Sequence, residues 1–224
     1  MNFYKTQKLL FFISFIFLPG LSFSNICPEW VEGNPILQIK PYWGEVGSEE
    51  IIKCLKEGQD LSVRDEMGRT PLHLAALYSK NPKVIKLLIQ GGSKISARNA
   101  SGGTALHDAA SRNHNPLVLE TLIRAGADVN AKNSNDWSPL HSSKFNKNEN
   151  IVKLLLSFGA NVNAEDDMRR TALHLAAPFG SIKKIKMLLD AGANPNAITK
   201  YGISPLHGAA GWNKDPKVII EIIE

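Results

Sequence analysis

Apolar residues recur along most of the chain at the spacing of a helix. Within several short runs they stand three or four positions apart, which places them on one side of a helix and polar residues on the other. These runs cover residues 84–89, 118–123, 151–156, 182–189 and 217–223. Short amphipathic helices gain most of their stability from packing, so the pattern predicts helices whose apolar sides form a shared core.

The same short sequence stands ahead of each of these helices. It reads Thr-Pro-Leu-His-Leu-Ala-Ala at residues 70–76 and begins again at Thr104, Ser138, Thr171 and Ser204, at intervals of 34, 34, 33 and 33 residues. Threonine or serine caps the free amides at the start of a helix, and proline suits the first helical position. A period of this length predicts an elongated array whose units bury their apolar faces against their neighbours, without a single catalytic pocket.

A loop rich in glycine and asparagine follows each run except the last and predicts a hairpin-like arm between repeats. The residue at the arm tip is, in order, Gly68, Gly102, Asp136, Arg169 and Gly202. Aspartate tolerates a positive φ, whereas arginine predicts a differently shaped turn. The third copy also replaces the alanine pair by Ser143 and Lys144. We therefore expect the middle of the array to be its least regular part.

This combination resembles the ankyrin repeat, which carries a Thr-Pro-Leu-His-x-Ala signature at a period of 33 residues. The resemblance covers residues 48–224. It implies an all-α solenoid of antiparallel helix pairs joined by hairpin-like loops, and its usual activity is binding another protein. We expect residues 48–58, capped by Ser48, to form the second helix of a half-repeat cap. About five repeats follow, the last one incomplete.

Residues 1–24 have the pattern of a secretory signal peptide. Two lysines precede an apolar run at residues 9–18, and a small-x-small cleavage site ends at Ser24. An uncleaved membrane anchor is the alternative, but the run falls short of the ~20 residues that span a bilayer. A lipoprotein would need a small residue at the position of Ile26, before Cys27. We therefore expect export with cleavage after Ser24.

Residues 25–47 show no helical period and contain several prolines and aromatic residues. We expect an irregular, extended lead-in that lays its aromatic side chains over the exposed end of the stack. The chain has two cysteines, Cys27 in this segment and Cys54 in the first helix. In an exported protein such a pair predicts a disulfide that joins the lead-in to the array. The alternative, that Cys54 is a buried thiol, stays open.

The charge balance argues against nucleic acid or membrane partners. Lysine and arginine number 26 against 21 acidic residues, and removal of residues 1–24 takes away two lysines and leaves a net charge of +3. The basic residues are scattered along the chain, as on an ordinary solvated surface. We expect no nucleic acid partner and no stable membrane insertion after cleavage.

Five of the six histidines share the repeat position of His73. Neighbouring helices lie about 8 to 10 Å apart, too far for histidines of consecutive repeats to share an ion through ~2.1 Å bonds. The resemblance implies instead that they bond nearby loop and cap groups. No nucleophile, phosphate-loop or metalloprotease motif occurs, and we expect Asp166 and Asp167 to form a solvated arm tip. We predict no catalytic residue, metal or cofactor, and an enzyme or metal protein built on a middle arm is the less favoured alternative.

By register with the ankyrin family, contacts to a partner come from the arm tips and the exposed end of the first helix. The predicted protein-binding residues are Met67, Arg69, Tyr78, Arg112, Trp137, Phe145, Phe179, Tyr201 and Trp212. These residue types anchor many interfaces, and the alternative is that several of them pack between repeats. The sequence thus predicts a non-catalytic interaction module or scaffold of bacterial type, exported to the periplasm or secreted. A secreted, host-directed effector that uses the same surface is the alternative.

The last helical run, residues 217–223, is rich in isoleucine, and no closing loop follows it. It is either the carboxyl-terminal lid of the stack or part of a longer array, and a partner could also cover it. Oligomerisation through this end is a further hypothesis.

Overall fold

The computed structural model describes residues 40–223, which form helices joined by turns and loops, with no strand among them. The predicted signal peptide at residues 1–24 lies outside the described residues, as does Cys27, so export and the disulfide stay predictions. Within the described part of the chain, no helix is both long and apolar enough to cross a membrane.

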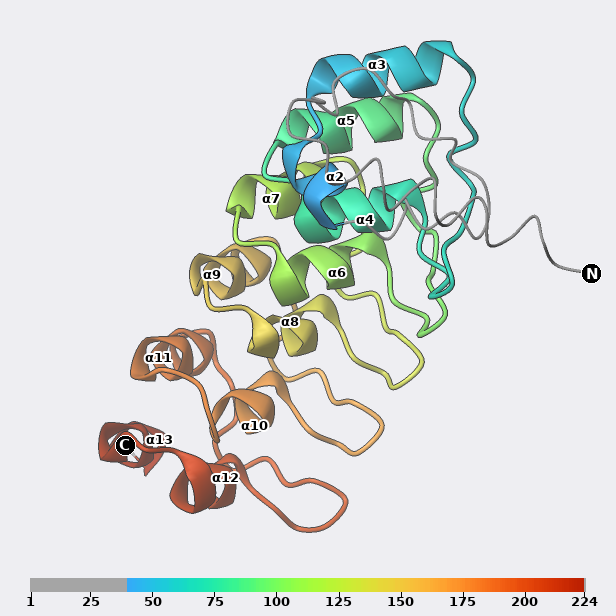
Figure 1. Cartoon of the computed structure of the whole chain (residues 1–224). Coiled ribbons are helices and arrows are strands. Elements are labelled where there is room, and N and C mark those ends of the chain that lie inside the picture. Colours follow the sequence, from blue (N-terminus) through green and yellow to red (C-terminus); the bar gives the residue numbers. More distant parts are fainter. Residues whose placement is uncertain (1–39, 224) are drawn as a thin grey trace, which may run out of the picture.

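Five helix pairs make up most of the molecule. They are α4 (Pro71–Tyr78) with α5 (Pro82–Gln90), α6 (Ala105–Arg112) with α7 (Pro116–Arg124), α8 (Pro139–Ser142) with α9 (Asn150–Ser157), α10 (Ala172–Ala176) with α11 (Ile182–Asp190), and α12 (Pro205–Trp212) with α13 (Pro216–Ile223). Figure 1 shows the pairs stacked one after another, with first helices in one layer, second helices in another and hairpin-like arms along one side. The predicted all-α solenoid is confirmed.

The repeated sequence caps each first helix. In α4, Thr70 and His73 form a capping box, in which the His73 ring accepts a hydrogen bond from the Thr70 amide at 3.2 Å. The same arrangement opens α6, α8, α10 and α12. The predicted cap at Ser48 is wrong, because Gly47 is the N-cap of α3 (Ser48–Lys56). The Ser48 hydroxyl instead accepts a hydrogen bond from Asn81 Nδ2 at 3.3 Å.

The core runs the length of the stack. Leu106 from a first helix and Ile85 and Leu122 from second helices are fully buried in one continuous apolar cluster. Ala75 and Ala76 are also fully buried, and their small side chains let neighbouring first helices approach closely. Each repeat is therefore stabilised mainly by the repeats on either side of it.

The lead-in is not irregular throughout. Residues 40–45 form a short helix, α2 (Lys40–Glu45), which packs on α4, whereas the sequence predicted an extended segment over residues 25–47. Tyr42 and Trp43 are buried in the core with their ring centroids 5.2 Å apart in an edge-to-face contact. Burial of two aromatic side chains stabilises a helical turn that a short isolated segment does not hold.

The helices α2 and α3 together form the amino-terminal cap of the array. The helix α2 packs on α4 as each first helix packs on the next, while α3 packs on α5 in the layer of second helices. The cap is therefore a helix pair, where the sequence predicted a second helix alone. Within α3, Cys54 is fully buried in the core.

The middle of the array is its least regular part, as predicted. The first helices α8 and α10 have four and five residues, against eight in α4, α6 and α12. A 3-10 turn, η3 (Ser143–Phe145), continues α8, and the Ser143 hydroxyl donates to the Leu140 carbonyl at 2.6 Å. This local bond competes with regular helix bonding and tightens the last turn.

Candidate functional site

In each arm tip, one side chain accepts two backbone hydrogen bonds and so stabilises the turn. Asp166 Oδ1 accepts from the amides of Met168 at 3.0 Å and Arg170 at 2.7 Å. The equivalent acceptors in the other arms are Asp65, Asn99, Asn133 and Thr199. Because short polar side chains close the same turn in every arm, the five tips share one shape.

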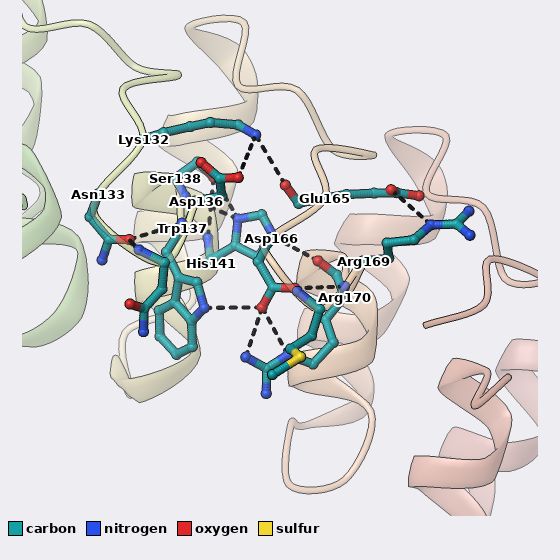
Figure 2. Close-up of polar contacts among 12 residues, drawn as sticks. Lys132, Asn133, Asp136, Trp137, Ser138, His141, Glu165, Asp166, Arg169 and Arg170 are labelled. Atoms are coloured by element: carbon teal, nitrogen blue, oxygen red, sulfur yellow. Dashed lines mark hydrogen bonds and ion pairs between the residues drawn. The ribbon is translucent and has the colours of Figure 1, made fainter. Parts of the chain in front are cut away.

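The arm tip also requires one residue in the left-handed region. Asp136 and Arg169 have φ angles of 58° and 59°, close to the 68° of Gly68 at the same repeat position. The prediction of a different turn at Arg169 is therefore wrong. The two hydrogen bonds to Asp166 fix the turn, and Arg169 Nε donates to Glu165 Oε2 at 3.2 Å (Figure 2).

Backbone hydrogen bonds join each arm tip to the next one. The Ala100 amide donates to the Met67 carbonyl at 2.9 Å. The later arms repeat this bond from Ser134 to Ser101 at 3.0 Å, from Asp167 to Asn135 at 3.2 Å and from Lys200 to Met168 at 3.1 Å. The arms therefore form one connected row, which holds their exposed side chains at a regular spacing.

The repeated histidine joins each first helix to the following arm. His141 Nδ1 accepts from the Ser138 amide at 3.2 Å, so Nε2 carries the proton and donates to the Arg170 carbonyl at 3.0 Å (Figure 2). The carbonyls that His73, His107 and His174 bond in this way are those of Gly103, Trp137 and Ile203. The expectation that these four histidines bond loop and cap groups is confirmed.

The buried histidines predict that acid destabilises the fold. Burial lowers the pKa of His73 to about 4 and also lowers the pKa values of His107, His141 and His174. In the unfolded chain histidine takes up a proton near pH 6.5, so their contribution is fully present above that pH. As the pH falls from about 6.5 toward the native pKa values, each histidine lowers the free energy of unfolding by up to about 1.4 kcal/mol per pH unit.

The buried carboxyl group of Asp108 has the opposite effect and stabilises the fold in acid. Burial raises the pKa of Asp108 to about 7, so its contribution to stability grows as the pH falls. Four imidazoles outweigh one carboxyl, and we expect urea unfolding to show lower stability at about pH 5 than at about pH 7.5. Equal or higher stability at the lower pH would show that the histidines do not control the acid response.

Three large aromatic side chains are exposed between the first and second helices of three successive repeats. Phe145 ends the 3-10 turn η3, Trp212 ends α12, and Phe179 lies in the turn after α10. The exposed fractions of these side chains are 60% for Phe145, 81% for Phe179 and 65% for Trp212. We call these three residues the aromatic row. An exposed apolar patch on a folded protein marks an interaction site. The sequence predicted all three as contact residues.

The arm tips add further exposed side chains. Met67 and Tyr201, both predicted contact residues, are 60% and 76% exposed at the tips of their arms. Arg112 is also exposed, at the repeat position of the aromatic row. The exposed apolar surface of the arms further includes Met168 and Ile203.

Several of the predicted contact residues make bonds or contacts within the array, among them Phe145, whose ring stacks on that of Trp137. Arg69 Nη2 lies 2.7 Å from Oδ2 of the buried Asp65, and Tyr78 packs partly buried against the core. Trp137 is half-buried, and its Nε1 donates to Asp166 Oδ2 at 3.0 Å (Figure 2). These residues stabilise the array in addition to any contact they make with a partner.

The sequence predicted that Asp166 and Asp167 form a solvated arm tip, and for Asp166 this prediction is wrong. Its side chain is fully buried in an ion pair with Arg170 at 2.8 Å, while the neighbouring Asp167 is exposed. The repeat register contained a sign of this, because Asp166 holds the position of Asp65. Lys144, which the sequence pattern did not indicate as a contact residue, is half-buried and lies over the rings of Trp137 and Phe145.

Side chains able to bind a metal do not gather in the described part of the chain. No three histidine, cysteine, aspartate or glutamate residues among residues 40–223 are placed to hold one ion. The bonds of the repeated histidines run to backbone carbonyls and capping residues instead.

Comparison with known proteins agrees with this geometry. The family model described as ankyrin repeats, in three copies, matches residues 44–133 and 109–199. Among curated proteins, none matches the chain. The family matches together cover more than half of the sequence, and they include the helix pairs from α4 with α5 to α10 with α11 and the four bridging histidines. The chain therefore belongs to the ankyrin repeat family.

Proposed function

We propose that this chain is a non-catalytic module that binds a protein partner through the aromatic row and the arm tips. Ankyrin repeats indicate a protein–protein interaction module, and proteins with them are generally non-catalytic. The observation that carries the proposal is the exposure of Phe145, Phe179 and Trp212 after the first helix of three successive repeats. Aromatic side chains of this size dominate the energetics of many interfaces.

Replacing Phe145, Phe179 and Trp212 by alanine is expected to abolish partner binding without unfolding the chain. Exposed side chains contribute little to the free energy of unfolding, whereas truncation of an interface anchor costs about 2 kcal/mol or more of binding energy. Cross-linked capture from fractions of the producing cell, followed by mass spectrometry, measures the loss. Circular dichroism and urea unfolding confirm that the variant is folded.

A matched control replaces three exposed apolar residues of the second helices by alanine. Ile52, Leu117 and Ile220 are 38%, 55% and 54% exposed on α3, α7 and α13. This second-helix variant removes a similar kind of surface from the other layer of the solenoid, so it should retain the partner. Retention of the partner by the aromatic-row variant and loss by the control would move the binding surface to the second helices.

The proposal includes export of the protein to the periplasm or beyond a bacterial cell. Its support is the signal-like sequence of residues 1–24 and the presence of two cysteines, Cys27 and Cys54. Fractionation with mass spectrometry of the mature amino terminus tests it. Protein that begins after Ser24 in the periplasm or medium would support export, and an intact amino terminus in the cytosol would contradict it.

A secreted effector that acts on a host would use the same surface, and only its final location distinguishes it. An enzymatic role based on Asp166 and Asp167 is less favoured. The Asp166 carboxylate already accepts four hydrogen bonds, from Trp137 Nε1, Met168 N, Arg170 N and Arg170 Nε. A carboxylate held in this way is poorly placed to take a proton from a substrate.

A further inference from the structure

Two cationic side chains converge on the aromatic rings of the third repeat. Lys144 Nζ lies 5.1 Å from the ring centroid of Trp137 and 4.8 Å from that of Phe145. Arg170 Cζ lies 5.8 Å from the Trp137 centroid. The Trp137 and Phe145 rings are stacked with centroids 6.1 Å apart. We call these four residues the cationic platform.

The charges at the platform do not cancel. Asp166 is the carboxylate that faces it, and Arg170 neutralises Asp166 through an ion pair at 2.8 Å. Lys144 has no ion pair among the described residues. Burial lowers the pKa of Lys144, and repulsion from Arg170 lowers it further. The platform therefore carries one uncompensated positive charge in a partly desolvated position, where a negative group is attracted most strongly.

Exposed apolar side chains stand on the platform and in the repeat that follows it. Phe145 is 60% exposed on the platform itself, and the next repeat contributes Phe179 at 81% and Met168 at 37% exposure. A single charge within an apolar surface fits one anionic side chain that stands between apolar ones.

We propose that the cationic platform binds an aspartate or glutamate side chain of the protein partner, with apolar neighbours of that residue seated on Phe145 and Phe179. The inference rests on the proposed function and specifies the partner's chemistry. A carboxylate matches the single uncompensated charge, whereas a phosphate group carries about two negative charges, one of which would find no partner on the platform. The carboxylate would approach the Lys144 ammonium group from the solvent side of the two rings.

The test uses three synthetic peptides and the full chain. Each peptide is acetylated and amidated and has a leucine and a phenylalanine on either side of one variable residue, which is glutamate, glutamine or phosphoserine. Titration of nitrogen-15-labelled protein is followed at the indole N–H signal of Trp137, which a Trp137→Phe variant identifies. Lys144→Gln removes the charge, and Lys147→Gln is the matched control on an exposed lysine three positions away.

The glutamate peptide is expected to give a saturable shift of the Trp137 signal and to bind about tenfold more tightly than the glutamine peptide. Lys144→Gln should remove that difference, and Lys147→Gln should keep it. Equal binding of the glutamate and glutamine peptides would overturn the inference. So would the absence of a saturable shift, an equal loss in both lysine variants, or tighter binding of the phosphoserine peptide.

The experiments distinguish a failure of the carboxylate-binding inference from a failure of the proposed function. If the aromatic-row variant loses its captured partner while the wild-type chain binds the glutamate and glutamine peptides equally, or Lys144→Gln keeps the difference between them, the binding module stands and the carboxylate site falls. If the aromatic-row variant keeps its partner, the proposed function itself falls.

Discussion

Leu122→Ala is expected to lower the free energy of unfolding by about 2 to 5 kcal/mol. Leu122 is fully buried on α7, in the middle of the second-helix layer. The helix packs on α5 and α9 as well as on α6, so the cavity left by the substitution weakens contacts on both sides. In a linear stack the loss should extend beyond the mutated repeat, because each repeat depends on its neighbours.

Leu117→Ala on the same helix is the matched control. Leu117 is 55% exposed, and truncation of an exposed side chain usually changes stability by less than about 0.5 kcal/mol. Urea unfolding followed by circular dichroism measures both variants. Similar losses from the two substitutions would show that burial in the shared core does not determine stability at α7.

Asp166→Ala is expected to cost about 3 to 5 kcal/mol, because it removes a fully buried carboxylate and leaves four hydrogen-bond donors without their acceptor. The Asp166 side chain has no exposed surface. Its removal frees the amides of Met168 and Arg170, the indole of Trp137 and the guanidinium of Arg170. The fourth arm would then lose the two bonds that fix its turn and the indole bond from Trp137 of the third arm.

Asp167→Ala serves as the control for this substitution. The Asp167 side chain is exposed, and the bond from its backbone amide to the Asn135 carbonyl survives truncation. Its effect on urea unfolding should lie within about 0.5 kcal/mol of zero. If Asp166→Ala proved equally mild, the carboxylate would not be the group that folds the arm.

The helices and their starts were predictable because their causes are local. The spacing of apolar residues determines which side of a helix is buried, and threonine or serine three positions before histidine determines where it begins. The helix α2 was not predictable in this way. It forms because Tyr42 and Trp43 are buried in the core beside α4, and a distant contact of this kind leaves no periodic pattern in residues 40–45.

The aromatic row was predictable from the repeat register, since exposure at the end of the first helix follows from position alone. The bonds of Trp137 and Arg69 were not, because each depends on a carboxylate whose burial the sequence does not show. The turn at Arg169 was not predictable either. Its type argues against a left-handed turn, but the hydrogen bonds of Asp166 impose one.

The placement of Lys144 depends on a change in the backbone. The 3-10 turn η3 follows the four-residue α8 and carries both Lys144 and Phe145, and there Lys144 lies over the Trp137 ring. Sequence analysis predicted irregularity at this point but could not give the direction of one side chain.

The affinity of the captured partner for purified chain tests the central claim most directly. Calorimetry would compare the wild type with the aromatic-row variant and with the second-helix variant at Ile52, Leu117 and Ile220. We predict that the aromatic-row variant loses affinity by about thirtyfold or more while the second-helix variant binds as the wild type does. Unchanged affinity in the aromatic-row variant would contradict the claim that Phe145, Phe179 and Trp212 form the binding surface.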